Sequence, residues 1–154
     1  MHINFNELIA AHKKDCINED CCIETKVAKE NGKRFEIISD ENFTKIRIDD
    51  CLIDSLEVEK CDFGFVRHSN DEFYFLELKG NKIEKAYNQI IETIKYFEKD
   101  LIKIPQNKRY GFIVSSSGIP KAQIRINNLK QNFAKGKYGV KLEIQNMVIK
   151  HKPR

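Results

Sequence analysis

The chain has 154 residues, of which 41% are hydrophobic and 32% are charged, a composition typical of a folded domain rather than of a disordered chain. No apolar run approaches the ~20 residues of a membrane helix, and the N-terminus lacks the order of a secretory signal. We therefore expect a cytoplasmic protein without a membrane partner. The net charge of +4 permits a nucleic-acid partner without requiring one, and many basic residues fall within 121–154, where Glu143 is the single acid.

The first part of the chain is expected to form a helix and several strands. Apolar residues at helical spacing predict a helix over 3–14. Residues 15–33 are polar and give no clear pattern, although 21–25 are compatible with a short strand. Strands are predicted over 34–39 and 44–53, the second from its alternation of apolar and polar residues.

The second part begins with a hairpin and continues with alternating helices and strands. The hairpin joins strands over 61–68 and 72–79 through a turn near 69–71. The later elements are a strongly amphipathic helix over 82–100, a strand over 110–115, a helix over 120–135 and a strand over 140–150. With no repeats and no linker, this order predicts one domain over 1–154, of the α/β class, with a central mixed β-sheet flanked by helices on both faces.

The predicted hairpin carries charges inside apolar strands. Its sequence is CDFGFVRHSNDEFYFLELKG, in which Asp62 begins one strand and Glu77 and Lys79 end the other. A charge in a core strand costs free energy unless it is paired or holds a metal. Side chains two residues apart share one face of a strand, so Glu77 and Lys79 are expected to point the same way.

The length of the turn decides whether Asp62 joins the other two charges. A two-residue loop at Asn70 and Asp71 would place Asp62 opposite Lys79 on the same face. A three-residue loop would turn Asp62 to the other face. The predicted site therefore requires an even loop or a compensating bulge.

Two clustered carboxylates and a lysine suit a hard cation such as Mg²⁺ or Mn²⁺. Such a cation polarises a phosphodiester and lowers the pKa of a bound water, which Lys79 could orient. The alternative is a Glu77–Lys79 pair at a solvated strand end, with Asp62 as an unrelated acid.

The hairpin resembles the signature of the PD-(D/E)XK nuclease superfamily, whose members have the restriction-endonuclease-like fold. That signature is an Asp, a strand and turn, then Glu/Asp-x-Lys on the next strand, followed by a helix. The tripeptides KCD at 60–62 and ELK at 77–79 stand in these places, with a cysteine instead of the usual proline. The resemblance covers about residues 44–118.

The resemblance implies a restriction-endonuclease-like core and a set of functional residues. It implies that Asp62, Glu77 and the backbone carbonyl of Leu78 ligate Mg²⁺ or Mn²⁺, and that Lys79 positions the attacking water. Some members carry a glutamine on the following helix, for which Gln89 is the candidate. Tyr96 lies two turns further along the same helix.

Many members also supply an acid from the first helix. Glu7 is the candidate for this additional acid, with Glu24 as a second choice. A solvent-facing position for either residue is the plain alternative.

The resemblance implies a Mg²⁺-dependent phosphodiesterase, a hydrolase that acts as an endonuclease on DNA rather than RNA. A homodimer, or a subunit of a larger system, is compatible with a chain of this size. The alternative is a catalytically silent subunit that binds nucleic acid or a protein partner and retains the nuclease fold. The sequence leaves the strand and sequence specificity and the biological pathway open.

The cysteines give a further, weaker hypothesis. In a cytosolic chain we expect reduced, buried thiols. A thiol-bound metal is the alternative, although the C-x-x-C spacing of a typical zinc site is missing. The five cysteines are Cys16, Cys21, Cys22, Cys51 and Cys61.

Overall fold

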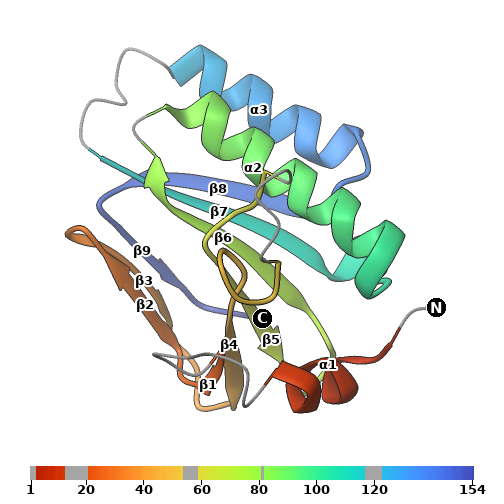
Figure 1. The fold of residues 1–154 in the computed structure, drawn as a ribbon. Coiled ribbons are helices and arrows are strands. Elements are labelled where there is room, and N and C mark those ends of the chain that lie inside the picture. Colours follow the sequence, from red (N-terminus) through yellow and green to blue (C-terminus); the bar gives the residue numbers. More distant parts are fainter. Residues whose placement is uncertain (1–2, 13–20, 54–58, 81, 117–122) are drawn as a thin grey trace.

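The computed structural model describes residues 3–12, 21–53, 59–80, 82–116 and 123–154. These residues form an α/β structure in which a large mixed sheet is covered by helices on one face and by a smaller sheet on the other (Figure 1). The α/β class with a central mixed sheet is therefore confirmed.

The larger sheet has six strands in the order β1-β4-β5-β6-β7-β8. Its antiparallel part runs from β1 to β6, and its parallel part comprises β6, β7 and β8. The strands are β1 (Cys22–Glu24), β4 (Phe43–Arg47), β5 (Phe63–Arg67), β6 (Phe73–Gly80), β7 (Arg109–Ser115) and β8 (Lys141–Asn146).

The helices of the described residues pack on one face of this sheet. They are α1 (Phe5–His12), α2 (Ile83–Tyr96) and α3 (Gln123–Lys135), and α2 continues directly into the π-helical turn η1 (Phe97–Leu101). A short 3₁₀ turn, η2 (Gln106–Lys108), precedes β7. Buried side chains of α1, α2, η1 and α3 share one core with Phe73 and Phe75 of β6. Figure 1 shows α2 and α3 side by side above the sheet, as the amphipathic pattern over 82–100 predicts.

The other face of the large sheet is covered by a small sheet, so the expectation of helices on both faces is wrong for the described residues. The small sheet has the order β2-β3-β9 and consists of β2 (Val27–Glu30), β3 (Lys33–Ile37) and β9 (Val148–His151). Phe35 and Ile149 of this sheet pack in one core with Phe65, Tyr74 and Phe112 of the large sheet. A sheet can bury an apolar face as a helix does, because alternate side chains on each strand point inward.

The chain changes sheets at Met147, where the sequence predicted one unbroken strand over 140–150. Met147 adopts a positive φ of 62° between β8 and β9. Its N–H donates to the carbonyl of Ser115 (2.9 Å), and its carbonyl accepts from the N–H of Arg34 (2.8 Å). The left-handed backbone is favoured by Gly or Asn and not by Met, so the residue type gave no signal of the break.

The cysteines differ from the expectation in one respect. Cys21 and Cys51 form a disulfide, with their Cα atoms 5.8 Å apart, so the prediction of reduced thiols is wrong for these two. Cys22 and Cys61 are buried thiols outside this disulfide, and Cys16 lies outside the described residues. The pairing of β1 with β4 brings Cys21 beside the turn that follows β4, a long-range contact that sequence spacing does not reveal.

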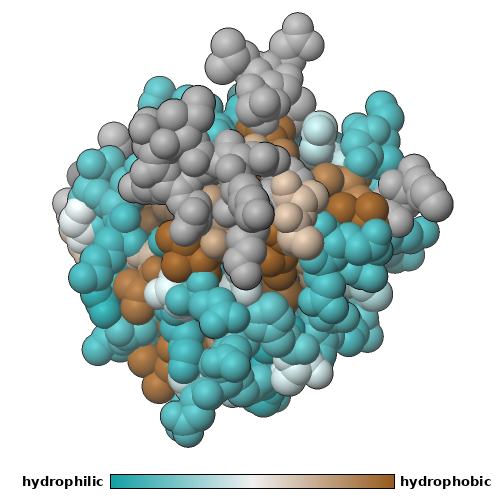
Figure 2. Space-filling model, turned by 60° about the horizontal axis from the view of Figure 1, so that its bottom comes forward, coloured by the Kyte–Doolittle hydropathy of each residue, from teal (hydrophilic) through white to brown (hydrophobic). Residues whose placement is uncertain are grey.

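The surface drawn in Figure 2 is largely hydrophilic, with hydrophobic side chains visible between the polar ones in small groups. Among the described helices, none has the length and apolar character needed to cross a membrane.

Candidate metal centre

The hairpin of β5 and β6 fixes the position of Asp62 relative to Glu77. The strands pair from Phe63 with Leu76 to Val66 with Phe73. The Arg67 N–H donates to the Glu72 carbonyl (2.9 Å), so residues 68–71 form a four-residue loop. The two-residue loop is therefore wrong, but the even loop that the site requires is present.

Continuing this register by one residue places Asp62 opposite Glu77 rather than opposite Lys79. Residues opposite each other in antiparallel strands share a face of the sheet. The alternating side chains of β6 enter two different cores, as the sequence predicted. Phe73 and Phe75 point toward the helices, whereas Tyr74, Leu76 and Leu78 point toward the small sheet.

Two hydrogen bonds tie Asp62 to residues 77 and 78 of β6. The Asp62 N–H donates to Oε1 of Glu77 (3.2 Å), and the Leu78 N–H donates to Oδ2 of Asp62 (2.9 Å). The two residues are 4% and 1% exposed, respectively. The structure therefore brings together the two predicted carboxylates and the backbone of Leu78, at the end of β6 from which the chain enters α2.

The electric field of this pair acts on Cys61. Burial raises the pKa of the Cys61 thiol well above its usual value, and the negative charges of Glu77 and Asp62 raise it further. The hydroxyl of Thr93 has a smaller opposite effect. Cys61 therefore remains a protonated thiol at neutral pH and is unsuited to act as a nucleophile, which would have to be a thiolate.

Helix α2 holds the segment that carries Asp62. The Cys61 N–H donates to Oγ1 of Thr93 (2.9 Å), and the Thr93 hydroxyl donates to the Gln89 carbonyl (2.6 Å). Nε2 of Gln89 donates to the carbonyl of Lys60 (3.4 Å). Gln89 therefore lies beside the site, where its side chain supports the backbone just before Asp62.

The turn after β4 holds Asp62 from another side. The N–H groups of Ile48 and Asp49 both donate to the Asp62 carbonyl, at 3.0 and 3.3 Å. Oδ1 of Asp49 forms an ion pair with Nζ of the buried Lys60 (3.8 Å). The disulfide at Cys51 closes the same turn onto β1.

Sequence reasoning missed Thr93, Lys60 and Asp49 as neighbours of the site. Thr93 gave one usable signal, since it is a polar residue within the apolar stripe of α2. Lys60 and Asp49 gave none, because their contact joins segments that are distant in sequence.

A β-bulge distorts β6 just after Glu77. Glu77 pairs with Ile113 of β7 and Gly80 pairs with Ser115, so Leu78 and Lys79 together oppose one residue. Bulges re-aim side chains and are common beside functional sites. The prediction that Glu77 and Lys79 share a face assumed regular strand pairing through both residues, which the bulge interrupts. Lys79 belongs to β6, but its side chain lies outside the described residues.

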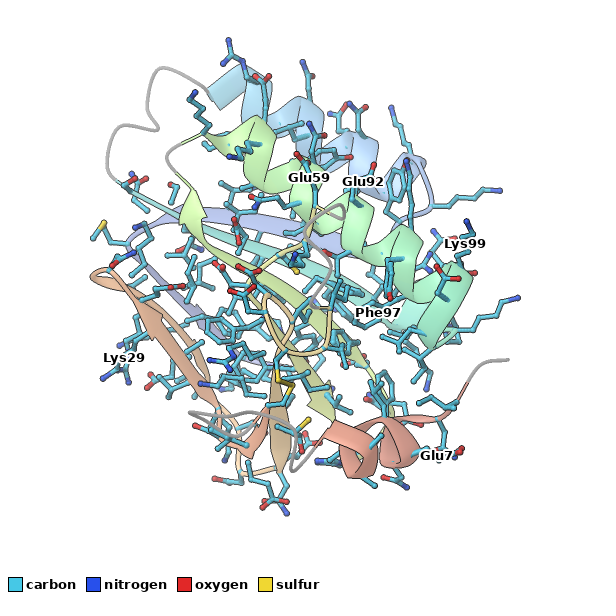
Figure 3. All side chains as sticks on the ribbon, in the orientation of Figure 1. Glu7, Lys29, Glu59, Glu92, Phe97 and Lys99 are labelled. Atoms are coloured by element: carbon cyan, nitrogen blue, oxygen red, sulfur yellow. A yellow bond between two sulfur atoms is a disulfide. The ribbon has the colours of Figure 1, made fainter. Side chains whose placement is uncertain are left out.

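The candidate acids of the N-terminal part lie away from this centre. Glu7 is exposed in α1, where its N–H donates to Oδ1 of Asn4 (2.8 Å) as a helix cap. Phe5 of α1 stacks on Phe73 (5.5 Å), at the opposite end of β6 from Glu77. Figure 3 shows Glu7 at the outer side of α1. The structure therefore does not bring Glu7 together with Asp62 and Glu77, and Glu24 is likewise exposed, on the edge strand β1.

The described side chains around this centre do not form a dense set of metal ligands. Within the described part of the chain, no group of three or more His, Cys, Asp or Glu side chains is arranged to hold a metal ion. The centre thus has two carboxylates rather than a dense cluster of ligands. No protein-family model, curated protein or solved structure matches the chain.

Proposed function

We propose that the protein is a metal-dependent nuclease that hydrolyses phosphodiester bonds, with Mg²⁺ or Mn²⁺ held by Asp62 and Glu77. The observation that carries the proposal is the position of these two buried carboxylates opposite each other, where Glu77 accepts the Asp62 N–H and Asp62 accepts the Leu78 N–H. DNA is the proposed substrate and endonucleolytic cleavage the proposed mode, both from the resemblance of KCD at 60–62 and ELK at 77–79 to the PD-(D/E)XK signature. A restriction-endonuclease-like core is proposed on the same grounds.

The donor set fits a hard divalent cation. A carboxylate offers about four acceptor positions, so Asp62 and Glu77 can each accept a backbone N–H and still be ligands of a cation. Mg²⁺ is typically bound by one or two carboxylates, with the remaining positions filled by water and phosphate oxygens. The backbone carbonyl of Leu78 is a proposed third ligand.

Each residue has a separate task in the proposed reaction. A bound cation would polarise the scissile phosphate and lower the pKa of a coordinated water. Asp62 and Glu77 would supply carboxylate oxygens as ligands, and hydrogen bonds from backbone N–H groups keep these carboxylates in a fixed orientation before the substrate arrives. Lys79 is proposed to orient the attacking water and to offset the negative charge that develops on the phosphate. Gln89 is proposed to act indirectly, by supporting the backbone of Lys60.

Cleavage of a substrate panel tests the proposal. Plasmid DNA, single-stranded DNA and RNA are incubated with the protein in Mg²⁺ or Mn²⁺, and the variants Asp62→Asn and Glu77→Gln are compared with Glu92→Gln. Glu92 is an exposed acid of α2, so the last variant makes the same chemical change away from the centre. Loss of about 100-fold or more in rate is expected for the first two variants and no change for the third. Cleavage that survives Glu77→Gln in a folded protein contradicts the proposal.

A catalytically silent subunit that binds nucleic acid or a protein partner is the second candidate. The same backbone hydrogen bonds favour this candidate, because Asp62 and Glu77 could stabilise the end of the hairpin without binding a metal. In that case DNA or RNA binds without cleavage, and Glu77→Gln leaves the affinity for nucleic acid unchanged in Mg²⁺ and in EDTA. The mass of the complex in solution then shows whether the protein forms a homodimer or is a subunit of a larger assembly.

A further inference from the structure

A second concave site lies on the face of the large sheet away from α2. It is a cavity of about 500 Å³ between β6, β7 and β8 on one side and the chain from Lys150 to Arg154 on the other. Tyr74 and Phe112 in its wall belong to the core that faces the small sheet, not to the core beneath α2. The cavity is therefore separated from Asp62 and Glu77 by the sheet itself.

One wall of the cavity is aromatic. The ring of His151 lies 5.1 Å from that of Tyr74 and 4.9 Å from that of Phe112, between ring centroids. Tyr110 packs edge-on against Tyr74 at 5.5 Å. Tyr110 and His151 are half-buried, so part of each ring faces the cavity. Burial lowers the pKa of His151, which leaves its ring neutral at pH 7 and suited to stacking.

The acids of the lining are already engaged by protein groups. Glu72 forms an ion pair with Arg67 (3.0 Å) and accepts hydrogen bonds from the hydroxyl groups of Tyr74 (3.4 Å) and Tyr110 (3.3 Å). Glu143 is paired with Lys141 (3.1 Å).

The remaining cations of the lining are Lys150, Lys152 and Arg154. Lys150 lies opposite Glu36 in the pairing of β3 with β9, and its charge also acts on that carboxyl, which is hydrogen-bonded to Arg34. Arg154 lies close enough to Tyr110 for its charge to act on the pKa of that phenol. The rim of the aromatic wall thus carries an excess of positive charge.

We propose that this cavity binds a nucleoside diphosphate, with the base against Tyr110 and His151 and the phosphates on Lys150, Lys152 and Arg154. Two phosphates offer enough anionic oxygens to engage all three cations. The volume lies within the range of about 300–1,000 Å³ typical of small-molecule sites. The inference does not rest on the proposed nuclease function, since it uses different residues on the other face of the sheet.

Calorimetric titration in EDTA tests the inference, because removal of divalent cations keeps metal-dependent hydrolysis out of the experiment. The full chain is titrated with ADP, GDP, CDP and UDP, and separately with adenosine and with pyrophosphate. At least one diphosphate is expected to bind with a Kd below about 1 mM, more tightly than either adenosine or pyrophosphate. Absence of binding overturns the inference, and pyrophosphate binding as tight as that of the nucleotides overturns the role of the aromatic wall.

Matched variants separate the site from general attraction by surface charge. The double change Lys150→Ala and Lys152→Ala removes two exposed cations from the rim and is expected to weaken binding about 10-fold or more. The control, Lys29→Ala and Lys99→Ala, removes two exposed lysines that Figure 3 shows elsewhere on the molecule. Equal weakening by both pairs overturns the proposed site. Thermal unfolding without ligand checks that both proteins are folded.

Discussion

Replacement of Thr93 by Val tests how α2 supports the candidate metal centre. Thr93 is fully buried, and its Oγ1 accepts the N–H of Cys61 at 2.9 Å. Valine has nearly the same shape but no acceptor, so the Cys61 N–H would be left buried and unpaired. The expected loss in the free energy of unfolding is about 1–3 kcal/mol. The lost bond to the Gln89 carbonyl adds little, because that carbonyl is also an acceptor within α2.

Thr93→Ser is the matched control. Serine keeps the hydroxyl and loses one methyl group, which costs about 1 kcal/mol through reduced burial and a small cavity. Urea unfolding gives both stabilities, and hydrogen exchange at the Cys61 amide separates the causes. That amide should exchange slowly in the wild type and in Thr93→Ser, and rapidly in Thr93→Val. A Val variant with wild-type stability and a protected Cys61 amide would refute this account of the contact.

Three further predictions address the rest of the fold. Gly64→Ala should cost about 1–3 kcal/mol in urea unfolding, because its Cβ would lie 2.2 Å from Cζ of Phe73, and the additional change Phe73→Leu should recover part of that loss. The pKa of Glu41 is lowered to about 2, first by hydrogen bonds from Arg67 and Ser69. The stabilisation of the folded state by ionised Glu41 is therefore present above pH 4.5 and is lost as the pH falls toward 2. Glu41→Gln should therefore lower stability at pH 6 but not at pH 2, and a difference that persists unchanged at pH 2 contradicts the pairing. Reduction of the disulfide between Cys21 and Cys51, which are 30 residues apart, should lower the free energy of unfolding by about 3–4 kcal/mol, whereas a protein purified with both thiols free would contradict the disulfide.

The predictable part of the fold follows from hydrophobic periodicity. The stripe with Ile90 and Ile94 predicted the helix that became α2, because burial of one face dominates the stability of such a helix. Alternation in β6 likewise predicted which side chains enter each core. Parity was enough to place Asp62 and Glu77 on one face once the loop was even.

The parts that were not predicted depend on contacts between distant segments. The four-residue loop is held by Arg67, which pairs with Glu41 (2.6 Å) and Glu72 (3.0 Å), and Glu41 lies 26 residues away. Asp71 in the loop has a φ of 61°, which its sequence context does not specify. The turn expected near 69–71 is therefore longer than either of the two loop lengths considered, and the sequence left its parity open.

The small sheet could not be predicted for a related reason. Its parallel pairing of β3 with β9 joins Arg34 to Val148, and the switch of sheets occurs at Met147, a residue without turn propensity. A period-2 pattern identifies a strand but not the sheet to which the strand belongs.

Binding of Mn²⁺ to the metal-free protein, measured by calorimetry, tests the central claim most directly. The account predicts a site with a stoichiometry near one that is weakened about 10–100-fold or more by Glu77→Gln and is unaffected by Glu92→Gln. If the wild type binds no Mn²⁺, or if the Glu77→Gln protein binds it equally well, Asp62 and Glu77 close the end of the hairpin without holding a metal.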